Sequence, residues 1–314
     1  MKIVIGYDGS EAANRALKDL VNAGLPRLVQ ARIIQAVPPL LPLESLAPAG
    51  ESVTWYAEAY KTAMADHKVV MDGAKAKSRE AAALLEDLFP SWKVSARTLV
   101  DVPARAILDA AEAWKADLIV VGSTGWNAFS KLILGSVADN VIKHAHCTVR
   151  LGRRGAQSKS HPPRLLIAFD GSPYAEEAVR QIASRAWPEG TEAKVLAVSE
   201  FQLHLGDMAV ALNRTLGLKH GRTSPWPGME KKLARAAEQL ARAGIRAATV
   251  MSIDEPRRGI LAEARKMKAD AIVMGTHGLS GLDRFFLGSV SASVAAHAPC
   301  TVEIARARAK RARK

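Results

Sequence analysis

The chain has 314 residues, of which 48% are hydrophobic and 24% charged, a composition typical of globular proteins and unlike disordered or fibrous ones. This length suggests two domains, because a single core usually serves about 100–200 residues. The longest apolar runs, such as LIVV at 118–121, fall far short of the roughly 18 residues of a membrane helix, and the N-terminus shows no leader pattern. We therefore expect a cytoplasmic protein with no membrane segment.

The net charge of +13 is unevenly spread along the chain. Six lysines and arginines stand within 306–314, where alanine alternates with basic residues and no apolar stripe is present to dock a helix. Two interpretations of this basic tail stay open. It is either a solvated extension or a weak, salt-dependent contact with nucleic acid or another polyanion.

The chain consists of two similar halves. IVIGYDGS at 3–10 matches LLIAFDGS at 165–172, and residues 120–149 align with 273–302 without a gap, identical at 13 of 30 positions. The repeated unit of about 150 residues has the size of a domain and is too long for a solenoid repeat. RRGAQSKSHPP, between the halves, is polar and proline-rich like a linker. We predict four parts: an N-terminal domain (1–152), a linker (153–163), a C-terminal domain (164–305) and the basic tail (306–314).

Apolar runs alternate with helical patterns in the first half. The predicted strands are 3–7, 31–37, 93–100, 117–122 and 147–152, and the predicted helices are 12–24, 53–88, 103–116 and 136–144. Ser10 precedes the first helix as a cap. Strands that are apolar throughout and separated by helices indicate a parallel sheet covered on both faces. In such a sheet, ligands bind at the carboxyl ends of the strands, where the strand order reverses.

The two cysteines stand at matching places in the two halves. Cys147 and Cys300 each begin an apolar CTV segment. We expect two small buried residues, because two thiols without further ligands indicate neither a disulfide framework nor a metal site.

A glycine-rich stretch follows the fourth predicted strand of each half. GSTGWNAFSKLILGS begins at Gly122, and GTHGLSGLDRFFLGS begins at Gly275 with the same glycine spacing. A glycine turn leading into a capped helix is the structural interpretation of a single copy. The second copy with identical intervals favours a binding loop instead.

The glycine stretch has the parts of an anion site. Gly122 and Gly125 can take positive φ and let the backbone approach a bound group. At Gly135 the next helix begins, where the N–H groups of Ser136 and Val137 and the helix dipole converge on one place suited to an anion. We therefore expect a phosphate chain at this loop.

Further residues at the strand ends indicate a nucleotide. Asp8 and Asp170 end the first strand of each half, where a carboxylate either accepts hydrogen bonds from ribose hydroxyls or caps the following helix. We align RIIQAVPP in the second strand of the first half with AKVLAVSE, so that Val37 and Val198 end these strands. Backbone groups there are free to read an adenine edge. Base, sugar and phosphates would then lie across neighbouring strand ends.

The pattern G-x-x-G, nine residues, G-S, together with D-G-S and A-D-x-I-V-x-G, resembles the universal stress protein family over almost the whole chain. The resemblance implies a tandem member with a doubly wound, Rossmann-like α/β domain in each half. Each domain would have a five-stranded parallel sheet, and the two would form a pseudo-dimer through CTVRLG and CTVEIA. Because family members with the complete motif bind ATP, it also implies ATP in each half. Whether Mg²⁺ accompanies the ATP stays open. The implied ATP-binding residues are Asp8, Val37, Gly122, Gly125, Gly135, Ser136 and Val137, and in the second half Asp170, Val198, Gly275, Gly278, Gly288, Ser289 and Val290.

No catalytic set is evident in the sequence. It contains neither a phosphate-binding G-x-x-x-x-G-K-[ST] loop nor a recognisable nucleophile motif. The leading hypothesis is a nucleotide-responsive stress or signalling module with an unidentified protein partner. The alternatives are a slow ATPase or other adenine-nucleotide enzyme, and a polyanion-associated protein acting through the basic tail. Further self-association, and the choice among ATP, ADP, AMP and cyclic nucleotides, stay open.

Overall fold

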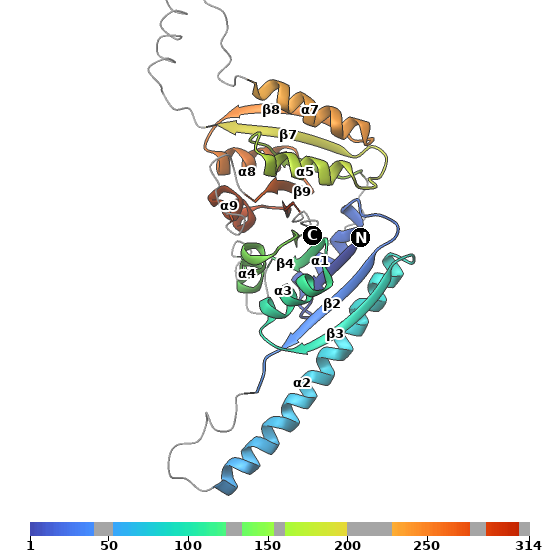
Figure 1. Ribbon diagram of the computed structural model, residues 1–314, viewed down its shortest axis with the longest axis vertical. Coiled ribbons are helices and arrows are strands. Elements are labelled where there is room, and N and C mark those ends of the chain that lie inside the picture. The colour runs from blue at the N-terminus through green and yellow to red at the C-terminus, as the bar shows by residue number, and fades with distance from the viewer. Residues whose placement is uncertain (41–52, 124–133, 154–160, 200–227, 277–286, 308–314) are drawn as a thin grey trace, which may run out of the picture.

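The computed structural model describes residues 1–40, 53–123, 134–153, 161–199, 228–276 and 287–307 (Figure 1). Gly125 and Gly278, in the middle of the two glycine loops, lie outside the described residues. None of the helices in these ranges is long and apolar enough to cross a membrane.

Strands and helices alternate in the first half, as the sequence predicts. They are β1 (Lys2–Gly6), α1 (Glu11–Asp19), the short 3₁₀ helix η1 (Leu20–Asn22), β2 (Gln30–Val37), α2 (Val53–Leu88), β3 (Lys93–Val100), α3 (Pro103–Trp114), β4 (Leu118–Gly122), α4 (Ser136–His144) and β5 (Thr148–Gly152). The predicted bounds of β3, α2 and α4 are confirmed. Ser10 is the N-cap of α1, because its hydroxyl accepts the Ala13 N–H at 3.1 Å.

The second half repeats this order. Its elements are β6 (Arg164–Ala168), α5 (Pro173–Ala183), β7 (Glu192–Ser199), α7 (Met229–Arg242), β8 (Arg246–Ile253), α8 (Pro256–Lys266), β9 (Ala271–Gly275), α9 (Ser289–His297) and β10 (Thr301–Ala305). In Figure 1 this half lies above the first, coloured from yellow-green to red.

The strands form one sheet in the order β3-β2-β1-β4-β5-β10-β9-β6-β7-β8. Neighbouring strands are parallel within each half. The chain order reverses between β1 and β4 and again between β6 and β9, which is the arrangement of a doubly wound domain. The predicted α/β fold with a five-stranded parallel sheet in each half is therefore confirmed.

Helices cover both faces of the sheet. On one face α3, α4, α8 and α9 pack over a single buried core that continues from one half into the other. On the opposite face each half has its own core, under α1 and α2 in the first half and under α5 and α7 in the second. Cys147 and Cys300 are buried, as expected, and neither is part of a disulfide.

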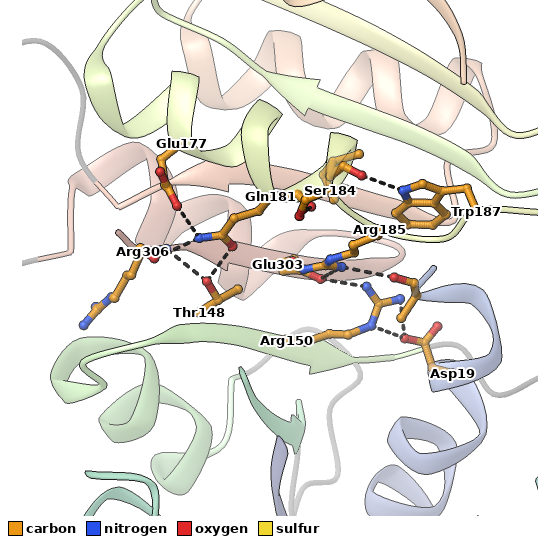
Figure 2. Close-up of polar contacts among 12 residues, drawn as sticks. Asp19, Thr148, Arg150, Glu177, Gln181, Ser184, Arg185, Trp187, Glu303 and Arg306 are labelled. Atoms are coloured by element: carbon orange, nitrogen blue, oxygen red, sulfur yellow. Dashed lines mark hydrogen bonds and ion pairs between the residues drawn. The ribbon is translucent and has the colours of Figure 1, made fainter. Parts of the chain in front are cut away.

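The halves meet edge to edge at β5 and β10, which pair antiparallel with Arg150 opposite Glu303. This pairing confirms the predicted pseudo-dimer through CTVRLG and CTVEIA. Figure 2 shows the polar groups at this seam. The buried Arg150 guanidinium donates to Glu303 at 3.0 Å and to Asp19 at 2.9 Å, and Arg185 also pairs with Glu303. Four buried charges therefore neutralise one another where the halves join.

The structure corrects the start of the basic tail. Arg306 is only 7% exposed, and its guanidinium donates to the carbonyl oxygens of Ile142 and Ala145 at the C-terminal end of α4. The solvated interpretation is thus wrong for this residue. Its guanidinium caps the C-terminal end of α4, where the last carbonyl groups have no partner within the helix. The remaining tail charges, from Arg308 onward, lie outside the described residues.

Candidate functional site

A pocket of about 140 Å³ lies at the carboxyl ends of β1 and β4, where the strand order reverses. Its walls come from β1 and the turn after it, from β2, from the end of β4 and from the starts of α1, α3 and α4. The lining residues are Gly6, Tyr7, Asp8, Ser10, Ala13, Ile34, Ala36, Pro103, Ile107, Val121, Gly122, Gly135, Ser136, Val137 and Ala138. Of the residues predicted for the first half, the structure therefore brings together Asp8, Gly122, Gly135, Ser136 and Val137.

The two ends of the glycine loop are tied to each other. The Gly135 N–H donates to the Ser123 carbonyl at 2.9 Å, and in the second half the Gly288 N–H donates to Thr276 at 2.8 Å. This hydrogen bond holds the start of α4 directly beside the end of β4. The loop thus places a helix N-terminus at the wall of the pocket.

The start of α4 differs from the start of α1, which borders the same pocket. Ser10 caps α1 through its hydroxyl, whereas the N-cap of α4 is Gly135, which brings no side-chain acceptor. The first N–H groups of a helix have no partner within the helix. Those of Ser136 and Val137 are therefore available to an anion in the pocket, and the helix dipole favours negative charge there.

Asp8 braces the turn after β1. Its Oδ1 accepts the Ser10 N–H at 2.9 Å, and Asp170 accepts the Ser172 N–H at 3.0 Å in the second half. The capping role considered for these aspartates belongs to the serines, since Ser10 and Ser172 are the N-caps. The Asp8 carboxylate also borders the pocket, so the ribose contact stays a prediction.

Gly122 is required for a reason other than the expected one. Its φ is not positive, so the expected positive φ is wrong for this residue. A Cβ at Gly122 would lie 2.9 Å from the backbone carbon of Ala12 and 3.0 Å from the Ala13 nitrogen. Gly275 approaches Tyr174 in the same way, at 2.7 Å. Glycine lets the end of β4 touch the first turn of α1, and the end of β9 the first turn of α5. In the first half this contact brings the starts of α1 and α4 together.

Val37 stands beside the pocket and does not line it. It is 4% exposed, and its carbonyl accepts the Asp101 N–H at 3.0 Å, which joins the ends of β2 and β3. The preceding residue, Ala36, lines the pocket instead. Because side chains alternate along a strand, Ala36 faces α3 and Val37 faces the opposite side of the sheet.

The alignment of the second strands is wrong by one residue. We count along β2 from the residue that pairs with the last residue of β1, and along β7 from the residue that pairs with the last residue of β6. Val198 then corresponds to Ala36, and Ser199 corresponds to Val37. The repeated Ala-Val pair misled the sequence comparison, because the register of a strand is fixed by its neighbours and not by local similarity.

Tyr7 is a wall residue that the sequence analysis missed. Its hydroxyl donates to Asn14 Oδ1 at 2.8 Å, and burial raises the pKa of Tyr7 above its ordinary value. The side chain is thus a neutral wall at neutral pH, held in place by Asn14. Its place next to Asp8 was the available signal.

A lysine approaches each D-G-S turn. The Lys77 side chain lies over Gly9, whose Cβ would be 2.9 Å from it, and Lys232 Nζ donates to the Gly171 carbonyl at 2.9 Å. These lysines come from the helices α2 and α7, which occupy the same place in the order of elements of the two halves. They place positive charge close to the carboxyl ends of β1 and β6.

The comparisons with known proteins agree with this architecture. The sequence profile of the "Universal stress protein family" matches residues 1–151 and 163–306. A universal stress protein of Methanocaldococcus jannaschii is 33% identical over 150 residues, which cover 47% of this chain and 79% of the relative. One of Mycobacterium tuberculosis is 26% identical over 320 residues, covering 97% and 96%.

A solved structure extends the likeness to the whole fold. The crystal structure of a universal stress protein from Archaeoglobus fulgidus matches with a TM-score of 0.61 at 20% identity, and the match covers 98% of both chains. The family pattern thus occurs twice, on two halves with the same order of strands and helices. The chain belongs to the universal stress protein family and is a tandem member of it.

Proposed function

We propose that this protein binds ATP at the pocket between β1 and β4 and acts in the cytoplasm as a nucleotide-responsive stress or signalling module. The observation that carries the proposal is the meeting of Asp8 with the glycine-capped start of α4 in one pocket at the reversal of strand order. ATP bound in the pocket would connect the turn after β1 with the start of α4, and a protein partner could recognise this ATP-bound conformation.

The pocket fits the parts of an adenine nucleotide. Its inner wall is apolar and includes Ile34, Ala36 and Ile107, which suits a flat base. The N–H groups of Ser136 and Val137 would hold phosphate oxygens, and the Asp8 carboxylate would accept from ribose hydroxyls. ATP would supply the negative charge that the N-terminus of α4 stabilises.

Binding is favoured over catalysis by the charges at the pocket wall. Among the described residues that line it, the ionisable ones are Tyr7 and Asp8. A phosphoryl-transfer site needs a positioned nucleophile and cations around the reacting phosphate. We therefore propose that bound ATP turns over slowly or not at all, which release of inorganic phosphate over hours would measure.

Isothermal titration with ATP tests the binding. The double variant Gly135→Val/Gly288→Val places a side chain at both glycine caps, and we expect it to weaken binding by about tenfold or more. Gly73→Val is the matched control, because a Cβ at Gly73 on α2 meets nothing within 4 Å. No heat of binding with wild-type protein at millimolar ATP, or equal binding by the double variant, would contradict the proposal.

A further inference from the structure

A second cavity, the seam cavity, lies where the two halves join. It is formed at the amino ends of β1, β4 and β5, whereas the proposed nucleotide pocket lies at the carboxyl ends of β1 and β4. Its volume is about 390 Å³, and α5 and the chain after β10 complete its walls. Its side chains include those of Asp117, Cys147, Glu177, Ser184, Arg185 and Arg306. Both halves therefore contribute to this cavity.

Cys147 brings a thiol to the seam cavity. It immediately precedes β5 and is 6% exposed, whereas Cys300, at the equivalent position before β10, is 0% exposed. Cys300 is not one of the described residues that line the cavity. The two thiols therefore have the same place in the repeat and differ in their access to a small molecule.

Hydrogen bonds hold the wall beside Cys147 in place (Figure 2). The Thr148 hydroxyl donates to Gln181 Oε1 at 2.7 Å, and Gln181 Nε2 donates to the Arg306 carbonyl at 2.9 Å. The Arg306 backbone N–H in turn donates to the Thr148 hydroxyl at 3.2 Å. This ring of hydrogen bonds joins β5, α5 and the chain after β10, so the cavity wall is a fixed part of the seam.

Arg306 places a positive charge near Cys147. The residue is 7% exposed, and among the described residues its guanidinium meets carbonyl oxygens and no carboxylate. Its Nε is buried and has no hydrogen-bond partner in the described part of the chain. Burial lowers the pKa of Arg306, and a negative charge on Cys147 acts against this decrease. Because the attraction is mutual, Arg306 favours the thiolate form of Cys147.

The charges of the cavity wall suit a small zwitterion. Asp117 and Glu177 bring carboxylates to the cavity, and Arg185 and Arg306 bring guanidinium groups. Small disulfides built from amino acids, such as cystine, carry both ammonium and carboxylate groups. Each charge of such a molecule therefore finds an opposite charge on the wall.

We propose that Cys147 is a modification site, which forms a mixed disulfide with a small amino-acid-based disulfide in the seam cavity. The Cys147 thiolate attacks one sulfur atom of the small disulfide, so that a new S–S bond forms and the old one breaks. Cys147 is oxidised, and the other half of the reagent leaves as a thiolate that takes a proton from water. An excess of a small thiol reverses the exchange.

Mass spectrometry of the full chain after incubation with cystine counts the adducts, and peptide mapping locates them. We expect one adduct per folded chain, on Cys147, and its removal by dithiothreitol. Cys147→Ser should lose the adduct, and the matched control Cys300→Ser should keep it. An adduct that forms only in urea, or on Cys300 at an equal rate, would overturn the proposal, because the thiols would then react through unfolding. The test needs no ATP, so its outcome is independent of the proposed function.

A variant of the cavity wall tests the place of the reaction. Ser184→Trp adds a large side chain to the wall and should lose the adduct at the same incubation time. Glu176→Trp, at an exposed position of α5 outside the cavity, is the control and should keep it. Circular dichroism verifies that both variants fold. Equal rates of modification in Ser184→Trp and wild type would overturn the assignment to the cavity.

The role of the arginine is tested by the rate of modification at pH 7. Arg306→Met should slow the reaction about threefold, because a thiolate fraction lower by about tenfold is partly offset by a more nucleophilic thiolate. Arg153→Met removes the arginine that interacts with Cys300 and should leave the rate at Cys147 unchanged. An unchanged or faster reaction of folded Arg306→Met would overturn the role of Arg306. If this variant does not fold, the comparison of Cys147→Ser with Cys300→Ser decides the proposal.

Discussion

The glycines around the pocket serve three different physical purposes. Gly9 has φ of +77°, in the left-handed region that favours glycine, and so forms the turn after β1. Gly122 has no such φ and is required because the end of β4 touches α1. Gly135 begins α4 without a side chain that would occupy its first N–H groups. One sequence motif thus combines a close approach with an open helix start.

The Gly122→Ala variant tests the close approach. The added methyl group must push α1 away from β4, and overpacking of this kind costs about 1–3 kcal/mol in the free energy of unfolding. Urea unfolding measures the loss. Gly73→Ala is the control, since its methyl group enters open space on α2 and should leave stability equal or higher. An unchanged stability of Gly122→Ala would show that the backbone contact relaxes freely.

Two arginines connect the helices of one half with the last strand of the other. Arg153 follows β5, and its guanidinium donates to the Ala298 carbonyl at 2.6 Å, just after α9. Arg306 follows β10 and donates to the Ala145 carbonyl, just after α4. Each half therefore caps the C-terminus of a helix in the other half, where positive charge is favoured by the helix dipole. This exchange ties α4, which borders the pocket, to the second half.

Replacing Arg306 by Met should destabilise the protein, because buried carbonyls at the end of α4 lose a charged donor. We expect a loss of about 1–3 kcal/mol in the free energy of unfolding, measured by urea unfolding. Arg242→Met, at an exposed arginine of α7, is the control and should change stability little. If Arg306→Met is destabilising, a test of nucleic-acid binding by the tail must delete residues 308–314 and retain Arg306. Equal stability of the two variants would contradict the capping role.

The pairing of the two halves depends on opposite charges at equivalent positions of the two repeats. Arg150 on β5 and Glu303 on β10 occupy the same position in the two repeats and face each other across the seam (Figure 2). Two copies of the same half would bring two arginines or two glutamates together in the buried seam, which is unfavourable. The single chain thus gains a specific pairing of its first half with its second.

The Glu303→Gln variant tests the seam through the pH dependence of stability. Burial raises the pKa of Glu303, but Arg185 and Arg150 outweigh burial and hold it below the ordinary value of 4.5. A carboxyl group whose pKa is lower in the folded than in the unfolded protein stabilises the fold fully at pH values above its unfolded pKa. This stabilisation is lost as the pH falls through the folded pKa. The variant should therefore be less stable at pH 7, by about 3–5 kcal/mol.

Urea unfolding between neutral pH and pH 3 checks both parts. The difference between wild type and Glu303→Gln should stay constant above about pH 4.5 and narrow below it, because protonation of Glu303 removes the same charge. Arg15→Gln, which removes an exposed pair with Glu11, is the control and should change stability little at any pH. A stability difference between wild type and Glu303→Gln that does not depend on pH would contradict an ionised Glu303 in the folded protein.

The sequence by itself determined the duplication, the order of strands and helices and the helix start at the glycine of each G-S pair. These features follow from local patterns, such as apolar runs, capping residues and glycine spacing, that each half repeats. The bounds of α2, β3 and α4 could be predicted for this reason. The seam between β5 and β10 was implied by the family resemblance and not by the pattern.

Only the tertiary structure decided which residues form the inner wall of the site. The register of β2 and β7 places Ala36 and Val198 at equivalent positions, and this register is set by hydrogen bonds to neighbouring strands. The burial of Arg306 and the close approach at Gly122 likewise arise between segments far apart in the chain. Contacts of this kind leave no local signal, because side-chain packing across elements depends on how the whole sheet and its helices fit together.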